Sequence, residues 1–279
     1  MVPARGARAY FQQLAEMGET ELVLEDEGRT GRTERRGRTE AAERTERTER
    51  TERRGRTERT GRTAKGGPAM YPAGITVPAP KEEDLFSTDP VRRAARLEEL
   101  RELIEACRKC SLGYTRTHIV PGEGNPNADL VCCGEAPGQT EDETGRPFVG
   151  ASGQLLTEIL RAIGIDRERD AFILNTLKCR PPGNRTPEPL ELNACAPYLH
   201  RQLELIKPKV ILALGRPAAQ TLLSTTAPLK DLRGKVHRYR GIPLVVTFHP
   251  AALLRDPNNK SATWDDVRIV RRLLDGEPG

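Results

Sequence analysis

Four short apolar runs, separated by helical patterns, constrain the fold of this chain more than any other feature. The runs are ADLVCCGE (128–135), AFILNTLKC (171–179), VILALG (210–215) and PLVVTFHP (243–250). They are continuous rather than alternating, as expected for strands that are buried on both faces. Strands that alternate with helices predict βαβ units, and therefore a mostly parallel sheet covered by helices on both faces. The fold class is α/β.

Helical patterns occupy the intervals between these runs. Helices are expected in SGQLLTEILRAIGI, where Ser152 is a candidate cap, and at 188–206, 217–224 and 263–274. A further helix is predicted in DPVRRAARLEELRELIEACRKC, because Asp89 and Pro90 are start signals and leucines recur at helical spacing. In such folds, ligands bind beyond the C-terminal ends of the strands.

Three of the apolar runs carry a chemically capable residue at or near their C-terminal ends: Glu135, Asn175 and His249. Each also has a plainer interpretation. A buried Asn needs hydrogen-bond partners, which a neighbouring loop most often supplies. A lone His is more often a satisfied core residue, although an imidazole here could stabilise an anion forming on a substrate. The convergence of all three at one edge of the sheet is the first functional signal.

The loop after the first run reads GEAPGQTEDETGRPFVG (134–150). Its Gly and Pro residues favour a tight turn and let a ligand approach backbone N–H groups. Phe148 stands on this loop between Pro147 and Gly150. Its ring suits a stacking platform for a planar base, and equally suits a plug for the core beneath the loop. GEAPGQ is no G-x-G-x-x-G turn, which argues against a nucleotide-binding redox enzyme.

Four of the six cysteines have a spacing that suggests a metal centre. A C-x2-C pair and two single cysteines could converge from three places in the chain, and the spacing does not separate iron–sulfur from zinc. The four are Cys107, Cys110, Cys179 and Cys195. Ordinary core burial fits Cys132 and Cys133 better, because both lie within an apolar run.

The N-terminal third differs sharply from the rest. Residues 1–27 could form a short helix and strand, and residues 28–75 are a linker that repeats Arg-Thr-Glu and is expected to be disordered. Residues 28–65 hold 14 basic and 7 acidic side chains, which leaves a net charge of −2 elsewhere. The repeat is either a tether to nucleic acid or a linker without a selected role. Residues 76–279 are the predicted folded domain.

No run of about 18 apolar residues is present, so no membrane span is expected. The N-terminus has no basic segment followed by an apolar core, so no secretory signal is expected either. These two features predict a cytoplasmic protein. Cysteines in that compartment are more often metal ligands, redox groups or core residues than structural disulfides.

Taken together, four blocks and the cysteine spacing resemble the family 4 uracil-DNA glycosylases, which carry an iron–sulfur cluster. The blocks are GEAPG, GRPFVG, LNTLKCRPPGNRTP and FHPAALLR, within about residues 90–275. The resemblance implies a three-layer α/β/α sandwich with a four-stranded parallel sheet, and a structural 4Fe–4S cluster on the four cysteines. It also implies hydrolysis of the N-glycosidic bond of uracil in DNA, leaving an abasic site.

The resemblance further implies roles for the residues of the base pocket. Phe148 would stack on the flipped-out uracil, and Asn175 would hydrogen-bond its edge and so reject cytosine. His249 would stabilise negative charge on the leaving uracil, while Glu135 would position water or hold the base. We further expect a monomer that acts on uracil-containing DNA. The N-terminal segment is a candidate site for a sliding clamp or another repair partner.

Four more residues receive roles from the resemblance. Glu141 would shape the pocket, and Leu253 and Arg255 would fill or brace the space left by the flipped nucleotide. Ala136 would lie against the base, at a position where glycosylases with a GQDPY motif carry a water-activating Asp. The main alternative is a non-catalytic iron–sulfur or zinc protein that binds nucleic acid on the same fold.

Overall fold

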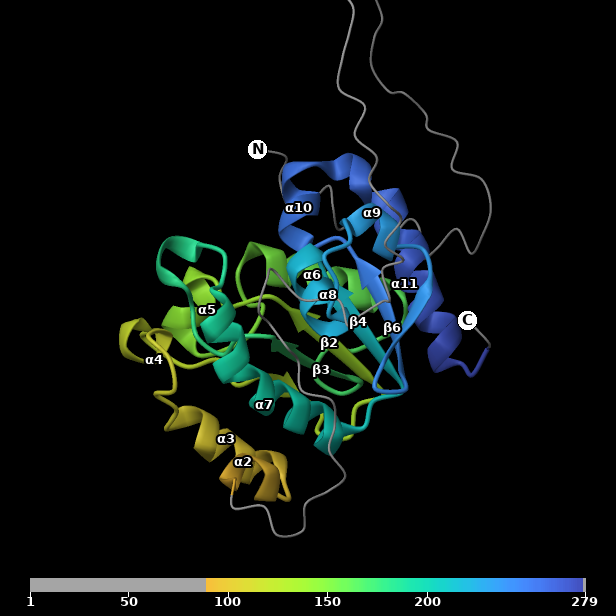
Figure 1. The fold of residues 1–279 in the computed structure, drawn as a ribbon. Helices are drawn as coiled ribbons and strands as arrows, with labels where there is room; N and C mark the ends of the chain where they lie inside the picture. Colours follow the sequence, from red (N-terminus) through yellow and green to blue (C-terminus); the bar gives the residue numbers. More distant parts are fainter. Residues whose placement is uncertain (1–88, 278–279) are drawn as a thin grey trace, which may run out of the picture. The chain divides into compact units, whose positions relative to one another are not determined.

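The computed structural model describes residues 89–277, which form a central sheet with helices around it (Figure 1). The strand order is β1-β3-β2-β4-β6-β5. The elements predicted at residues 1–27 and 28–75 lie outside the described residues, so their predicted structures stay predictions.

Four parallel strands form the centre of the sheet, and all four were expected from the apolar runs. They are β2 (Leu130–Gly134), β3 (Ala171–Asn175), β4 (Val210–Leu214) and β6 (Ile242–Thr247). The register pairs Gly134 with Asn175 and Leu214 with Thr247, so the carboxyl ends of the strands lie along one edge. Every residue of β2, β3 and β4 is buried, which explains why their sequences are apolar without alternation.

The expected sheet of four parallel strands was incomplete, because an antiparallel strand is added at each edge. β1 (Glu123–Gly124) pairs with β3, and β5 (Val236–Tyr239) pairs with β6. Two residues are too few for β1 to give a periodic signal. β5 is largely polar and joins β6 through Arg240 and Gly241, whose φ angles are 48° and 88°. Positive φ at both central residues is the geometry of a two-residue hairpin turn.

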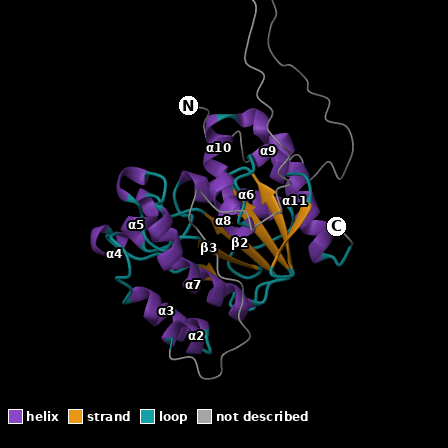
Figure 2. Cartoon of the chain, in the orientation of Figure 1, coloured by secondary structure: helices purple, strands orange, loops and turns teal. Residues whose placement is uncertain are grey.

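Helices cover both faces of the sheet, as the three-layer expectation required (Figure 2). One face packs against α6 (Ala151–Ala162), α10 (Pro250–Arg255) and α11 (Lys260–Leu274). The other packs against α7 (Pro189–Ile206), α8 (Arg216–Leu223) and α9 (Leu229–Leu232). The crossover from β2 to β3 uses α6 and the return from β3 to β4 uses α7. The chain moves one way across the sheet from β2 to β3 and the other way from β3 to β4. Right-handed connections therefore place α6 and α7 on opposite faces.

The predicted N-terminal helix is two helices, α2 (Pro90–Arg93) and α3 (Leu97–Glu105). Asp89 caps α2 as expected, since its side chain accepts a hydrogen bond from the Val91 amide at 3.0 Å. The α6 helix begins after Gly150, so the expected cap at Ser152 is wrong. Shorter elements complete the described chain: α4 (Leu112–Thr115), α5 (Gln139–Thr144), η1 (Pro182–Asn184) and η2 (Pro257–Asn259).

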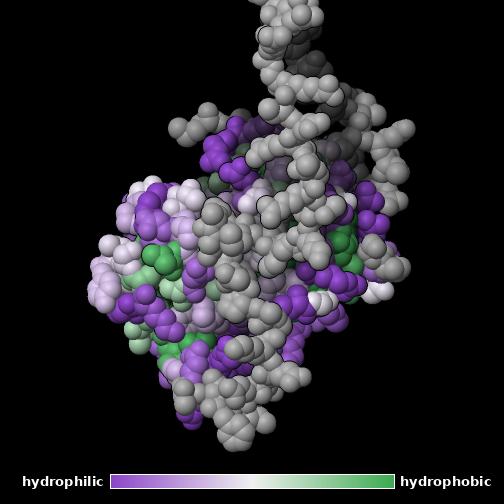
Figure 3. Space-filling view, in the orientation of Figure 1, coloured by the Kyte–Doolittle hydropathy of each residue, from purple (hydrophilic) through white to green (hydrophobic). Residues whose placement is uncertain are grey.

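Hydrophilic side chains cover most of the described surface in the view of Figure 3, and apolar ones form small separate patches. The large apolar side chains exposed among residues 89–277 are Tyr114, Leu190 and Leu254. Within the same residues, no helix is both long and apolar enough to cross a membrane.

Candidate active site

A cavity of about 620 Å³ lies at the carboxyl edge of the sheet. All four parallel strands deliver residues to it: Glu135 follows β2, Asn175 ends β3, Arg216 follows β4 and His249 follows β6. The expected convergence of Glu135, Asn175 and His249 is therefore confirmed. A cavity of this size suits a small planar ligand and its attached backbone.

Phe148 lies between the core and the cavity. Its side chain belongs to the core under α6 and is 5% exposed, yet it also lines the cavity. An added Cβ at Gly134 would lie 2.6 Å from the ring, so only glycine lets the ring sit over β2. The His249 ring is 5.5 Å away between centroids. The two interpretations of Phe148 are thus compatible, because a ring supported from below can still present a surface to a ligand.

Asn175 is 1% exposed, and its Oδ1 atom has no hydrogen-bond partner among the described residues. The plain expectation of a structural hydrogen bond to a neighbouring loop is therefore not met at this oxygen. A buried acceptor without a partner costs about 1–3 kcal/mol. Such an atom calls for an explanation, and a ligand with a donor at this position would provide one.

His249 caps α10 and is held as a neutral imidazole. Its Nδ1 accepts a hydrogen bond from the Ala251 amide at 3.1 Å, so the ring proton of the neutral form is on Nε2. The pKa of His249 is lowered from 6.5 to about 4, chiefly by burial and then by the positive charge of Arg255, while Glu141 opposes the shift. The residue therefore offers the cavity an N–H donor without a positive charge at neutral pH.

Glu135 is partly buried at the end of β2. Burial raises the pKa of its carboxyl group, and the nearby charge of Arg216 opposes that rise. Ala136 follows it, lines the same cavity and packs beside the cluster of Leu112, Leu177 and Cys179. The loop between β2 and α5 therefore contacts both the cavity and the cysteine region.

Glu141 lines the cavity, but hydrogen bonds to the backbone already use its carboxylate. Oε2 accepts from the Gly138 amide at 3.1 Å, and Oε1 accepts from the amides of Val149 and Gly150 at 3.0 Å each. These contacts join the loop before α5 to the loop that carries Phe148. The expected pocket-shaping position fits this geometry better than direct contact with a base.

The expected DNA-contacting pair near α10 needs one correction. Leu253 is 1% exposed and packs in the core with α6, whereas Leu254 is 38% exposed. Leu254 is therefore the exposed member of the pair, and two adjacent leucines in a helical run do not reveal this difference from sequence. Arg255 lines the cavity as expected.

Arg216 and Phe248 are among the cavity residues that sequence reasoning missed. Arg216 opens α8, and Phe248 precedes His249. The guanidinium of Arg233 lies over the Phe248 ring, at 4.3 Å from the ring centroid. Arg233 also forms an ion pair with the buried Asp266. Both residues follow closely after the C-terminal end of a strand, and this position in the sequence could have identified them.

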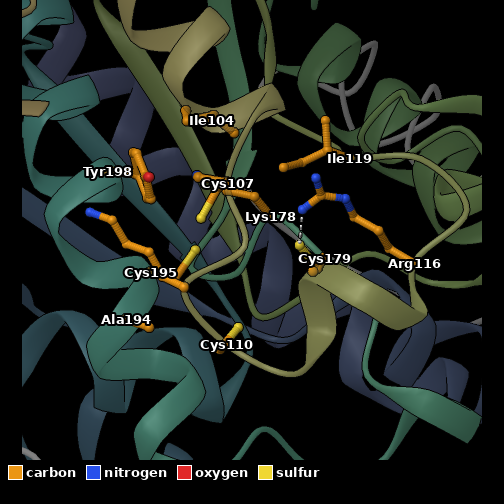
Figure 4. Close-up of a pocket in the computed structure, with 12 residues that line it drawn as sticks. Ile104, Cys107, Cys110, Arg116, Ile119, Lys178, Cys179, Ala194, Cys195 and Tyr198 are labelled. Carbon is orange, nitrogen blue, oxygen red and sulfur yellow. Dashed lines mark hydrogen bonds between the residues drawn. The ribbon is translucent and has the colours of Figure 1, made fainter. Parts of the chain in front are cut away.

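A second, smaller cavity of about 20 Å³ is lined by all four cysteines of the predicted metal centre. Figure 4 shows their sulfur atoms directed into this shared space, from the segment after α3, the segment after β3 and helix α7. Cys132 and Cys133 lie apart in the buried strand β2, as expected. All six are free thiols in the described chain.

Two basic side chains lie near the thiols. Arg116 donates a hydrogen bond to the Cys179 sulfur at 3.1 Å, and the fully buried Lys178 lies beside the cavity. Burial raises the pKa of Cys195 to about 12, so a thiolate there needs a cation such as a metal. Among residues 89–277, no group of three or more His, Cys, Asp or Glu residues is arranged to hold a metal ion.

Comparison with known proteins agrees with this geometry. A family model described as the uracil DNA glycosylase superfamily matches residues 121–268, and the chain belongs to that superfamily. A type-4 uracil-DNA glycosylase of Sulfurisphaera tokodaii is 44% identical over 186 residues, which are 63% of this chain and 84% of that protein. The type-4 enzyme of Pyrobaculum aerophilum is 48% identical over 181 residues, 62% of this chain and 92% of its own.

A third relative, the type-4 enzyme of Thermotoga maritima, is 45% identical over 185 residues, which are 65% of this chain and 96% of that protein. The relatives place the chain among the type-4 uracil-DNA glycosylases, which are hydrolases of DNA repair.

The state of His249 leads to a prediction about pH. Because its pKa lies at about 4 rather than 6.5, the imidazole is neutral across pH 5–9 and its donor is unchanged. The single-turnover rate of uracil excision should therefore show no transition near pH 6.5. Unfolded His249 binds a proton near pH 6.5, so this residue should reduce stability as pH falls from 6.5 towards 4.

The control for this experiment is His249→Gln, which keeps a donor and does not titrate. A rate that falls as pH rises through about 6.5, with no such transition in this variant, would mean that the imidazolium is the active form. A rate that falls as pH drops through about 6.5 would mean that the pKa of His249 is not lowered. Acidic transitions that persist in the variant belong to other groups, such as Glu135.

The two adjacent leucines give a second prediction. Leu253→Ala should lower the free energy of unfolding by about 2–5 kcal/mol, because it leaves a hole in the core. Leu254→Ala should leave stability almost unchanged and slow excision from duplex DNA more than from single-stranded DNA, since only a duplex has a gap to fill. Chemical denaturation and paired excision assays measure both effects. The reverse pattern would restore Leu253 as the DNA-contacting residue.

Proposed function

We propose that this glycosylase holds a flipped-out uracil in the cavity at the carboxyl edge of the sheet and cleaves its N-glycosidic bond. The observation that carries the proposal is the unpartnered Oδ1 of Asn175, buried in a cavity that Phe148 and His249 also line. A target base is unreachable inside a duplex, so it must leave the stack at a cost of a few kcal/mol. Stacking on Phe148 returns about 1–3 kcal/mol of that cost.

Asn175 supplies the selectivity in this proposal. Uracil carries a donor at N3 where cytosine carries an acceptor. Oδ1 of Asn175 therefore gains a hydrogen bond with uracil and faces an acceptor with cytosine. Because the oxygen is buried, water cannot relieve that mismatch, and leaving it unpaired is costly.

His249 supplies the catalytic electrostatics. As the glycosidic bond breaks, negative charge forms on the uracil oxygens, and the Nε2–H of a neutral imidazole donates to one of them. A preorganised donor in a water-poor site is worth about 10²–10³ in rate. Glu135 is the candidate that positions water, and Ala136 offers no carboxylate for that purpose. Catalysis on this chain thus depends on stabilising the leaving group.

DNA is contacted by Leu254 and Arg255 at the rim, in this proposal. Leu254 replaces the sequence-based candidate Leu253, because it is the exposed member of the pair. We further propose a monomer that works in the cytoplasm. The N-terminal segment remains our candidate contact for a sliding clamp or another repair partner.

The four cysteines fit a 4Fe–4S cluster in this proposal. The donor set is four free thiols from three chain segments, with an N–H donor to one sulfur and a buried lysine nearby. The sequence resemblance given above, rather than the cavity itself, favours a cluster over a single zinc ion. When bound, a cluster would supply a cross-link between α3, β3 and α7. It takes no part in the steps derived above.

Base excision from a labelled oligonucleotide with one uracil tests the proposal, read by strand cleavage at alkaline pH with a thymine control. We predict cleavage at uracil alone. His249→Ala should cut the single-turnover rate by about 10²–10³ while the melting temperature stays within a few degrees. A folded protein that binds uracil DNA without cleaving it would instead support the non-catalytic alternative.

The cysteine centre has its own prediction. Cys179→Ser should lower iron content, visible absorbance and thermal stability together, because it removes one ligand from the end of β3. The matched control is Cys133→Ala, a buried cysteine of β2 outside the cavity, which should keep the iron and the absorbance. Zinc in place of iron in the native protein, or unchanged iron in Cys179→Ser, would contradict the cluster assignment.

A further inference from the structure

Phe148 has a backbone conformation that a phenylalanine rarely adopts. Its φ angle is 51°, in the left-handed region that favours glycine. Relaxation to an ordinary φ would swing the ring away from the cavity edge. Some part of the structure must therefore impose this conformation, and such imposed strain is most common at functional sites.

Arg167 provides the restraint from one side. One guanidinium nitrogen donates to the Phe148 carbonyl at 2.9 Å and to the Thr157 hydroxyl at 3.0 Å. The other donates to the Pro147 carbonyl at 3.0 Å and to the Glu123 carboxylate at 3.0 Å. The side chain of Arg167 is 14% exposed and does not line the cavity. The guanidinium of Arg167 therefore binds two consecutive backbone carbonyls, those of Pro147 and Phe148.

Neighbouring residues complete this support. Glu123 lies on the edge strand β1 and is itself held by Arg146 at 2.8 Å, so the partner of Arg167 is fixed. Gly153 on α6 admits the Phe148 carbonyl, since a Cβ there would collide with it. Glu141 binds the amides that follow Phe148. The turn is thus held by carbonyl contacts from Arg167 and amide contacts from Glu141.

We propose that Arg167, oriented by Glu123, is a positioning residue that holds Phe148 in its left-handed turn and thereby sets the ring for stacking on uracil. The inference rests on the proposed stacking role of Phe148. Arg167 acts through that ring and contacts no substrate. Lysine is a poor replacement, because one ammonium group cannot reproduce the planar fork on two carbonyls and a carboxylate.

A double-mutant cycle tests the inference in the full-length protein. Excision from duplex DNA would be measured for Phe148→Ala, Arg167→Met and the combination, and kcat and KM would be separated in each. Stacking predicts that Phe148→Ala loses roughly 10- to 100-fold in kcat/KM. Arg167→Met should lose about tenfold, as expected for a misplaced group. In the Phe148→Ala background the same change should cost less than about twofold.

Four companion experiments make the result specific. Arg169→Met removes an exposed arginine two residues away and should change nothing measurable. Arg167→Lys should recover only part of the lost activity. Inhibition by free uracil reports the base pocket without DNA, and it should weaken in Arg167→Met. Glu123→Gln offers a milder perturbation with the same expected direction, should Arg167→Met fold poorly.

The outcomes separate the inference from the proposed function. Equal losses from Arg167→Met with and without the Phe148 ring would overturn the inference, as would a lower melting temperature with unchanged kcat/KM and uracil inhibition. A harmless Phe148→Ala would instead remove the stacking role on which the inference rests.

Discussion

The register between β2 and β3 is the constraint on which the site depends. It sets Gly134 opposite Asn175, and the missing side chain at Gly134 leaves room for both the Asn175 amide and the Phe148 ring. A Cβ at that position would meet both groups. A parallel ladder thus places the amide of Asn175, and the glycine opposite it allows the aromatic ring of Phe148 from another loop to lie beside it. The loops that follow β4 and β6 add Arg216 and His249 to the same edge.

Burial gives these groups their chemistry. Removal from water keeps His249 neutral, with its one ring proton on Nε2. It also leaves Oδ1 of Asn175 without a partner among the described residues, and in our proposal this atom discriminates between bases because solvent cannot satisfy it. Glu141 shows the opposite solution, since three backbone amides occupy its carboxylate. Asn175 and His249 each keep a polar atom that can still form a hydrogen bond, and both line the cavity. Glu141 instead uses its carboxylate to hold the surrounding loops.

The sequence predicted the parallel centre of the fold and most of the site, because both produce local signals. Buried strands are continuous apolar runs, and their ends identified Glu135, Asn175 and His249. Features that depend on tertiary contacts could not be predicted from the sequence. The edge strand β1 is two residues long, and Leu253 and Leu254 are identical in type but opposite in exposure. Arg167 stands in a charged surface segment, DRERD, where nothing marks it as the arginine that grips the Phe148 loop.

The two cavities share the end of β3. Asn175 closes the strand and borders the larger cavity, and Cys179 lies four residues later in the smaller one. Between them, the fully buried Lys178 donates to the Asn175 carbonyl at 2.6 Å, and Thr176 donates to the Glu135 carbonyl at 2.6 Å. These hydrogen bonds therefore hold the backbone around Asn175, and Lys178, which donates one of them, also lines the cysteine cavity. In our proposal, a cluster on the four cysteines would tie the segment after α3 and helix α7 to this stretch. It would thereby limit how far Asn175 can move while its amide holds the base.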